Sequence, residues 1–246
     1  MRYRVKRLVG RLRALLNHLK GKPVLIDSTL KQFLSNETAT GKPTIIVTFH
    51  VDDMYSIIKL ADTCTGFNTV FTSQKQKRNL NFLSKIIMNN PEKLKFDTTI
   101  SSNLLKNFKS GSCRFIFYGD TTVFAKSQSH HIYFDRVHRV SADWAILAKR
   151  IGANVVAIVP VNKRGVVYVK SKVIPINNSI QTLIYEANNF LEETVKSASI
   201  WQFYTPNLNL ENGSLNSLLK TEPDLLMSLS ATEPAFARII NSNSIG

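Results

Sequence analysis

Two hydrophobic patterns alternate along most of the chain. Short apolar and β-branched runs, typical of buried strands, are followed by stretches in which apolar residues recur every three or four positions, as in amphipathic helices. The first pattern predicts strands at residues 44–49, 67–71, 113–118, 154–161 and 166–174, and a short extended segment at 132–134. The second predicts helices at residues 52–62, 77–88, 101–109, 141–151 and 179–196.

The last two predicted strands differ in composition. Residues 154–161 are almost continuously Val, Ile and Ala, which predicts a strand covered on both faces. Residues 166–174 alternate, with Val167, Val169 and Val173 on one side, which predicts a half-buried strand. Because strands and helices alternate, we expect a single α/β domain with a mixed, mostly parallel sheet flanked by helices.

The chain divides into three parts by composition. Residues 1–22 have the pattern of a basic amphipathic helix, and residues 23–205 hold the alternating strands and helices. Residues 206–246 are rich in Asn, Ser and Leu. We expect the middle part to be the folded domain. The last part is interpreted either as one or two short helices or as a poorly ordered tail.

The N-terminal part is basic throughout. Residues 1–22 contain eight Lys or Arg and no acid, and their leucines recur at spacings of three and four. Such a helix can lie in the interface of an anionic membrane, where each basic side chain contributes roughly 1 kcal/mol. The alternative is a helix that packs on its own domain with a solvated basic face. Both interpretations stay open at this point.

The formal charge of the whole chain is +15 over 246 residues. This excess favours anionic partners, namely a membrane leaflet, an acidic carrier protein or nucleic acid. The basic residues follow no RNA-binding signature and no zinc-finger spacing, so nucleic acid is not the expected partner. Neither a signal peptide nor an apolar run long enough to span a bilayer is predicted.

The two cysteines are Cys64 and Cys113, which form neither a metal-ligand spacing nor a disulfide framework. We therefore expect a reducing, cytoplasmic setting. His130, His131 and His138 also match no zinc motif, and we expect no metal site.

The predicted strand at residues 44–49 leads directly to His50 at a strand-to-helix turn. Asp52 and Asp53 follow it by two and three positions. Active sites of open α/β sheets gather outside the carboxyl ends of strands, so this histidine is placed to act as a general base. The alternative is an ordinary turn residue, followed by two acids that cap the next helix.

Four blocks of sequence, in this order, resemble a known family. The blocks are Ile45-Ile46-Val47-Thr48-Phe49-His50, residues 104–120 ending in Gly119-Asp120, residues 132–168, and Trp201-Gln202-Phe203-Tyr204. Together they are similar to the lysophospholipid acyltransferase superfamily, and within it to the bacterial lipid A biosynthesis (lauroyl/myristoyl) acyltransferase branch. The resemblance spans about residues 40–205 and implies the same α/β fold.

The resemblance also implies a reaction. A fatty acyl group would move from a thioester, on an acyl-carrier protein or acyl-CoA, to a hydroxyl or amine, with His50 as general base and no cofactor beyond the thioester. It implies a cytoplasmic protein bound peripherally to the inner face of the membrane. The family carries an acid five positions after the histidine, where this chain has Tyr55. We expect Asp53 to replace it; otherwise the chain is a non-catalytic acyl-binding or carrier-binding relative.

The same resemblance implies further substrate contacts. Asp120 ends a strand in the second block, where it either positions the substrate or caps the loop. Arg136, Arg139 and backbone amides near the substrate loop are the candidate oxyanion donors. Lys75 and Arg78 follow the strand at residues 67–71 and are expected to contact a carrier protein or a phosphate. The alternative for these two is the solvated start of a helix. Asp52 and Tyr55 complete the expected substrate-binding set.

Overall fold

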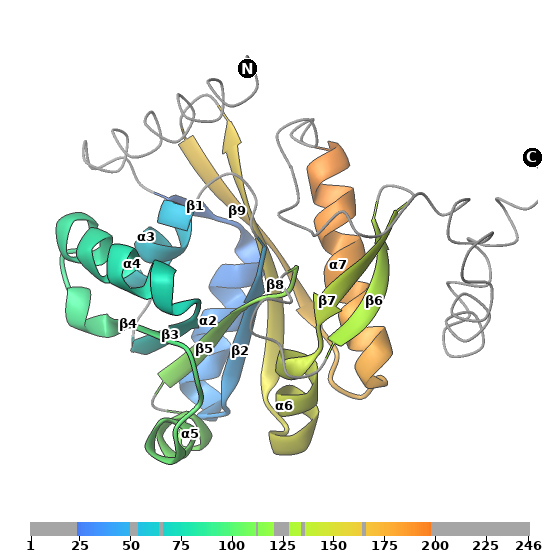
Figure 1. Ribbon diagram of the computed structural model, residues 1–246, viewed down its shortest axis with the longest axis horizontal. Coiled ribbons are helices and arrows are strands. Elements are labelled where there is room, and N and C mark those ends of the chain that lie inside the picture. The colour runs from blue at the N-terminus through green and yellow to red at the C-terminus, as the bar shows by residue number, and fades with distance from the viewer. Residues whose placement is uncertain are drawn as a thin grey trace, which may run out of the picture.

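The computed structural model describes residues 24–49, 54–63, 66–111, 113–120, 128–133, 136–163 and 166–197. The predicted helix at residues 1–22 and the predicted tail at residues 206–246 lie outside these ranges. The described chain is an α/β fold with one large, mostly parallel sheet between two layers of helices, as the hydrophobic pattern predicts (Figure 1).

The elements follow one another in a regular order. The chain forms β1 (Val24–Ile26), α2 (Ser28–Thr40), β2 (Thr44–Thr48), α3 (Met54–Thr63), β3 (Phe67–Phe71), α4 (Gln74–Ile87), a 3₁₀ turn (Pro91–Lys93), β4 (Leu94–Asp97), α5 (Ser102–Lys109), β5 (Cys113–Tyr118), β6 (Gln128–Tyr133), β7 (Arg136–Ser141), α6 (Asp143–Ile151), β8 (Asn154–Lys163), β9 (Val166–Ile174) and α7 (Ile180–Ser197).

The main sheet contains seven strands in the order β1-β9-β8-β2-β5-β3-β4. All neighbouring pairs in it are parallel except the hairpin β8–β9. A second, two-stranded antiparallel ribbon is formed by β6 and β7. The central strand is therefore β2, although it is only the second strand of the chain.

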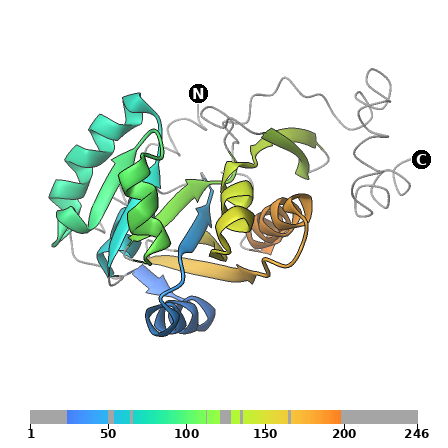
Figure 2. The same cartoon turned by 90° about the horizontal axis from the view of Figure 1, so that it is seen from below.

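Each face of the sheet supports its own hydrophobic cluster. On one face, residues of α2, α3 and α4 pack on strand residues such as Ile46, Val70 and Ile116. On the other face, residues of α5, α6 and α7 pack on strand residues such as Val47 and Phe115. Successive residues of a strand point to opposite faces, which is why β2 contributes to both clusters. Figure 2 shows α2 and the pair α6–α7 on opposite sides of the sheet.

Local capping explains several helix boundaries. Ser73 caps α4 by accepting a hydrogen bond from the Gln76 amide at 3.1 Å, and Ser101 caps α5 in the same way from Leu104 at 3.2 Å. α6 ends at Gly152, whose φ of 68° lies in the left-handed region that glycine adopts without strain.

Several elements differ from those predicted. The bounds of β3, β5 and β9 agree with the prediction, whereas β1, α2 and β4 were not predicted. The extended segment predicted at residues 132–134 belongs to the longer strand β6, which includes His130 and His131, and His138 lies in β7, a strand that was not predicted. Most residues of this ribbon are polar, so the sequence shows no hydrophobic alternation that would predict two strands. The two strands form because they pair with each other.

The alternation predicted for β9 holds for only part of the strand. Val167 and Val169 are buried as expected, but Val173 on the same side is 43% exposed. α2 packs on β9 on the side of Val169, whereas α7 packs on the other side, where Ile174 is buried. The covered face of β9 therefore changes along its length.

Asp27 ties the first two elements to β9. Its amide donates to the Val169 carbonyl at 3.2 Å, and its carboxylate accepts from the Ser171 amide at 2.7 Å and the Ser171 hydroxyl at 2.6 Å. The same carboxylate caps α2 by accepting from the Leu30 amide at 2.8 Å. This one side chain extends the pairing of the edge strand β1 and also starts a helix.

We expect Asp27→Ala to lower the free energy of unfolding by roughly 2 kcal/mol, because three donors lose a charged acceptor. Asp27→Asn keeps one acceptor oxygen and is expected to fall between wild type and alanine. Urea denaturation followed by circular dichroism measures both. Glu92→Ala, an exposed carboxylate on the 3₁₀ turn, is the control and should change stability by less than about 0.5 kcal/mol. Equal effects at positions 27 and 92 would contradict this role.

Candidate active site at the carboxyl edge of the sheet

A topological switch point lies between β2 and β5. The connection after β2 leads to α3 on one face of the sheet, whereas the connection after β5 leads through β6 and β7 to α6 on the other. The two strands are direct neighbours and pair in parallel from Thr44 with Arg114 to Thr48 with Tyr118. Ligand sites of open α/β sheets form outside the carboxyl ends of strands at such a point.

The end of β2 is rigidly placed. Residues 44–49 are all buried, and Phe49, the last described residue here, is 2% exposed. His50 is the next residue of the sequence. His50, Asp52 and Asp53 lie outside the described residues. Tyr55 belongs to the first turn of α3, and its side chain also lies outside the description.

The end of β5 is joined to its neighbours through Gly119. The Gly119 amide donates to the Thr48 carbonyl at 2.8 Å, and the Gly119 carbonyl accepts from the Ser141 amide at 3.3 Å. Asp120 follows directly and is buried. The backbone therefore holds Asp120 beside the end of β2, so β2 and β5 deliver their next residues to the same edge.

Position 119 has no room for a side chain. A Cβ atom there would lie 2.9 Å from Val47 Cγ1 and 3.0 Å from Phe49 Cε1. Val47 is in β2 and Phe49 directly follows it, and both side chains belong to the core cluster under α6. Glycine at this position lets the turn after β5 approach β2 closely, next to the residue that precedes His50.

Two buried hydroxyls lie on either side of the turn after β2. Thr48 ends β2 and Ser56 is in the first turn of α3, and both residues are fully buried. Within the described residues neither hydroxyl has a hydrogen-bond partner. Buried polar groups are usually paired, so unpaired hydroxyls next to a switch point are candidates for a ligand contact. Sequence reasoning missed them, because single Thr and Ser residues give no pattern.

The two arginines of the expected substrate loop lie on β7. Arg139 is two residues from Ser141, whose amide binds Gly119, whereas Arg136 is five residues away. At about 3.3 Å per residue, the backbone of Arg139 is roughly 10 Å closer to this turn than that of Arg136. The structure therefore brings position 139, rather than position 136, toward Asp120.

The ribbon that carries these arginines is anchored on α7. The Ser129 hydroxyl of β6 donates to the Gln181 side chain at 2.6 Å. His131 is buried, and its ring centroid lies 5.7 Å from that of Tyr185. These contacts fix the ribbon beside the sheet, although its two strands pair with no strand of the main sheet.

The remaining expected contacts are on α4, on the other face of the sheet. Arg78 is exposed on the outside of this helix. Lys75 lies in its first turn, with its side chain outside the description. Lys77 forms an ion pair with Asp97 of β4 at 3.3 Å. The structure does not bring Arg78 together with Asp120 across the switch point.

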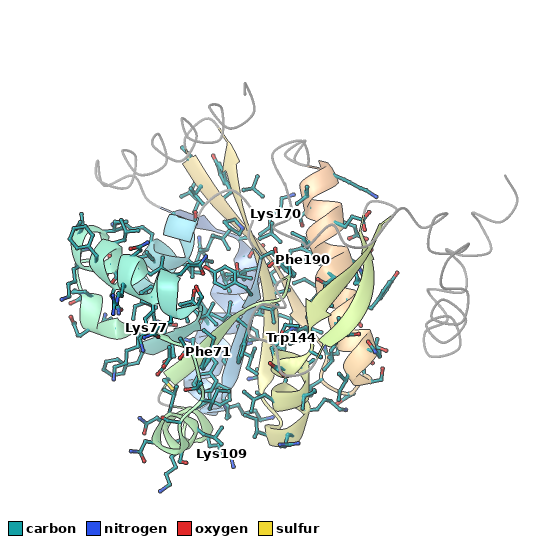
Figure 3. The ribbon with its side chains drawn as sticks, viewed as in Figure 1. Phe71, Lys77, Lys109, Trp144, Lys170 and Phe190 are labelled. Carbon is teal, nitrogen blue, oxygen red and sulfur yellow. The ribbon has the colours of Figure 1, made fainter. Side chains whose placement is uncertain are left out.

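A row of phenylalanine rings lies on the α5–α7 face near the end of β3. The Phe71 ring stacks on Phe117 with centroids 4.6 Å apart, and it meets Phe115 edge-on at 5.0 Å. Phe115 in turn stacks on Phe108 of α5 at 4.0 Å. Phe71, labelled in Figure 3, remains partly exposed at the carboxyl end of its strand. The alternation of Phe115 and Phe117 in one strand was the sequence signal for this row, of which only Phe71 reaches the surface.

A pocket of about 250 Å³ lies at the opposite edge of the sheet. Its lining includes Phe67, Lys95, Leu104 and Cys113. Cys113 begins β5, whereas the switch point follows the end of that strand. The pocket is therefore separate from the candidate active site.

No model of a known protein family matches the chain, and no curated protein is detectably similar to it. Within the described part of the chain, no three His, Cys, Asp or Glu side chains are grouped to hold a metal ion. In the same residues, no helix is long and apolar enough to cross a membrane.

We expect Gly119→Ala to destabilise the fold by about 1–3 kcal/mol, because the added methyl group overpacks Val47 and Phe49. The cost should be smaller in a Val47→Ala background, where one of the two contacts is removed. A double-mutant cycle by chemical denaturation measures this coupling. Additive effects of the two substitutions on the free energy of unfolding would show that a side chain at position 119 makes no steric contact with Val47.

We expect the Cys113 thiol to react slowly with alkylating reagents. Burial raises the pKa of the Cys113 thiol, and the Lys95 ammonium lowers it by less. The thiolate is the reactive form, so alkylation by iodoacetamide should rise with pH over a higher range than for an unstructured cysteine peptide. Lys95→Gln should move this range still higher. Peptide mass spectrometry measures the rates, and equal rates for protein and peptide would contradict the expectation.

Proposed function

We propose that the protein is an acyltransferase that moves a fatty acyl group from a thioester to a hydroxyl or amine. The observation that carries the proposal is the switch point between β2 and β5. β2 leads to His50 and β5 leads to Asp120, and the Gly119 amide joins the two strand ends at 2.8 Å. The sequence resemblance to the lysophospholipid acyltransferase superfamily is the reason why we assign acyl transfer to this edge of the sheet.

In the proposed reaction His50 acts as general base. Its imidazole takes the proton from the acceptor hydroxyl or amine while the acceptor attacks the thioester carbonyl carbon. The tetrahedral oxyanion that forms requires preorganised donors, and Arg139 is the better placed of the two candidate arginines. Collapse of the intermediate breaks the C–S bond, and the leaving thiolate receives the proton from the imidazolium. The acyl ester or amide and a free thiol are the products.

A carboxylate is needed to orient the imidazole and to stabilise its protonated form. Tyr55 holds the position of the usual acid and supplies no negative charge at neutral pH. We assign this role to Asp53, which follows His50 by three residues. Asp120 is assigned to the substrate, because β5 leads to the same edge from the neighbouring strand. Asp52 is kept as a second acid that contacts the substrate.

The row of phenylalanines supports a fatty acyl substrate. Phe71 and Phe117 lie at the carboxyl ends of β3 and β5, and the Phe71 ring is partly exposed. An acyl chain gains free energy by covering such apolar surface, roughly 0.8 kcal/mol for each CH₂ group removed from water. Phe117 is buried beneath Phe71, so we place the chain of the donor against the exposed part of the Phe71 ring, with its thioester toward Asp120.

The net charge of the chain is compatible with the proposed donor and the proposed location. An acyl-carrier protein is an acidic partner and acyl-CoA carries phosphates, and both suit a chain of charge +15. Lys75 is the proposed contact to either donor, since Arg78 lies on the outer side of α4. The basic segment at residues 1–22 is proposed to hold the protein peripherally on the anionic inner face of the membrane, with the protein in the cytoplasm.

A second candidate function is favoured by Tyr55. If Asp53 does not take over from the missing acid, the protein binds acyl chains or their carrier without transferring them. The switch point and the phenylalanine row suit binding as well as transfer.

The decisive experiment is thioester turnover by the full-length protein, with acyl-carrier-protein and acyl-CoA donors and a panel of hydroxyl and amine acceptors. We expect His50→Ala to lower the release of free thiol by about 10²–10⁴-fold, because the general base is lost. His18→Ala, a change within the basic segment at residues 1–22, is the control and should leave the rate unchanged. Circular dichroism confirms that each variant is folded.

Asp53→Asn separates the two candidate functions. We expect it to lower the rate, because the carboxylate that supports the imidazolium is lost. Turnover that is unchanged in His50→Ala would overturn the proposal. Binding of an acyl-carrier protein without turnover from any donor would favour the non-catalytic function. Steeply salt-dependent binding of oligonucleotides, with neither thioester turnover nor binding of an acyl-carrier protein, would favour nucleic acid as the partner.

A further inference from the structure

The outer side of α4 combines apolar and basic side chains. Phe82 and Ile86 lie one helical turn apart and are 66% and 49% exposed. Arg78 precedes Phe82 by four residues and Lys85 follows it by three, and both are exposed. Residues at these spacings share one side of a helix. These four residues are called the α4 face.

The fold does not need the α4 face for packing. The opposite side of α4 supplies Leu80 and Ile87 to the core cluster of α2, α3 and α4. Exposed apolar residues scattered singly are ordinary on protein surfaces. A large aromatic and a large aliphatic residue on adjacent turns, flanked by two cations, form a combined surface that is typical of interfacial helices.

The charge of this helix is of one sign. Its residues Gln74–Ile87 include no acid and four cations: Lys75, Lys77, Arg78 and Lys85.

The acids of neighbouring elements are engaged elsewhere or lie at the end of the helix. Asp97 of β4 pairs with Lys77 at 3.3 Å. Asp62 of α3 accepts hydrogen bonds from the amides of Asn89 and Asn90, just beyond α4, at 3.2 and 3.3 Å. Glu92 follows on the 3₁₀ turn. In the residues that the structure describes, Arg78 and Lys85 form no ion pair.

We propose that the α4 face binds an anionic lipid surface. Phe82 and Ile86 enter the boundary between headgroups and acyl chains, and Arg78 and Lys85 contact the lipid phosphates. α4 lies along the outside of the molecule (Figure 2), and Phe82 and Ile86 on it are exposed. A bilayer accommodates an exposed apolar strip without a matching groove, whereas a stable protein partner requires a complementary surface of roughly 1,200–2,000 Å² in total.

This contact has a consequence for the candidate active site. α4 begins directly after β3, where Thr72 donates to the Asp97 carbonyl at 2.9 Å, so its first turn lies at the carboxyl edge of the sheet. Docking through α4 therefore holds that edge next to the lipid surface. The inference does not rest on acyl transfer, and it concerns a surface separate from residues 1–22.

A local reporter distinguishes the α4 face from every other membrane contact. Phe82→Trp in the full-length chain is mixed with phosphatidylglycerol vesicles, with and without bromine on the acyl chains. We expect a blue shift of the emission and strong quenching by the brominated lipid. Phe67→Trp is the matched control, because Phe67 is 53% exposed at the start of β3, away from α4. The native Trp144 is fully buried, and wild type gives the background of both native tryptophans.

Partition of the protein into the same vesicles tests separately the contributions of the apolar and the basic side chains of the α4 face. Phe82→Ser with Ile86→Ser should weaken binding at least roughly tenfold, because the apolar surface that leaves water is lost. Lys85→Gln should weaken it by roughly fivefold, the effect expected for one cation at an anionic surface. Lys31→Gln, an exposed lysine on α2, is the control and should have no effect.

Three outcomes would overturn the inference. The first is quenching of Phe82→Trp no greater than that of Phe67→Trp, even if the protein binds vesicles through another segment. The second is equal binding to neutral phosphatidylcholine vesicles, which would remove the role of charge. The third is shielding of Phe82→Trp by a purified acyl-carrier protein but not by vesicles, which would assign the α4 face to an acidic protein. Thioester turnover is measured separately, without vesicles. Failure of the α4 face to bind lipid and failure of the proposed acyl transfer can therefore be told apart.

Discussion

The pairing of β2 between β5 and β8 is the constraint on which the carboxyl edge depends. Thr44 aligns with Arg114 on one side and with Asn154 on the other, and all five residues of the strand are buried. A shift of one residue would exchange the side chains of its two faces, which pack in two different clusters. The strand is therefore held in one register, and with it the point at which the chain leaves the sheet toward His50.

The two faces of the sheet have different surroundings. The α5–α7 face carries the phenylalanine row and the β6–β7 ribbon, which is anchored to α7 through Ser129 and His131. The α2–α4 face carries the basic helix α4 at its outer limit. Since the connections after β2 and β5 leave to opposite faces, the switch point has access to both. The proposed acyl chain, on the α5–α7 face, and the basic helix α4, on the α2–α4 face, therefore both lie next to the carboxyl edge of the sheet.

The sequence predicts the parts of the fold that depend on local patterns. β3, β5 and β9 are bounded by turn residues and were predicted to the residue, but β1 and β4 have only three and four residues, too few to show a period. α2 escaped prediction because most of its thirteen residues are polar. The expectation of a site at the carboxyl edge came from a general rule for α/β sheets. That β5 lies beside β2 did not follow, because β3 and β4 come between them in the sequence, and only long-range pairing decides it.

The small edge strand β1 joins parts of the chain that are made far apart in time. Its three residues pair with Val167–Val169, and Asp27 binds Ser171 across a sequence separation of 144 residues. At roughly 5–20 residues per second, a ribosome needs about 7–30 s to extend the chain from one to the other. Throughout that interval β1 lacks β9, the strand that it pairs with in the sheet. β1 therefore joins the sheet only after the last described strand has been made, although it precedes every other strand that the structure describes.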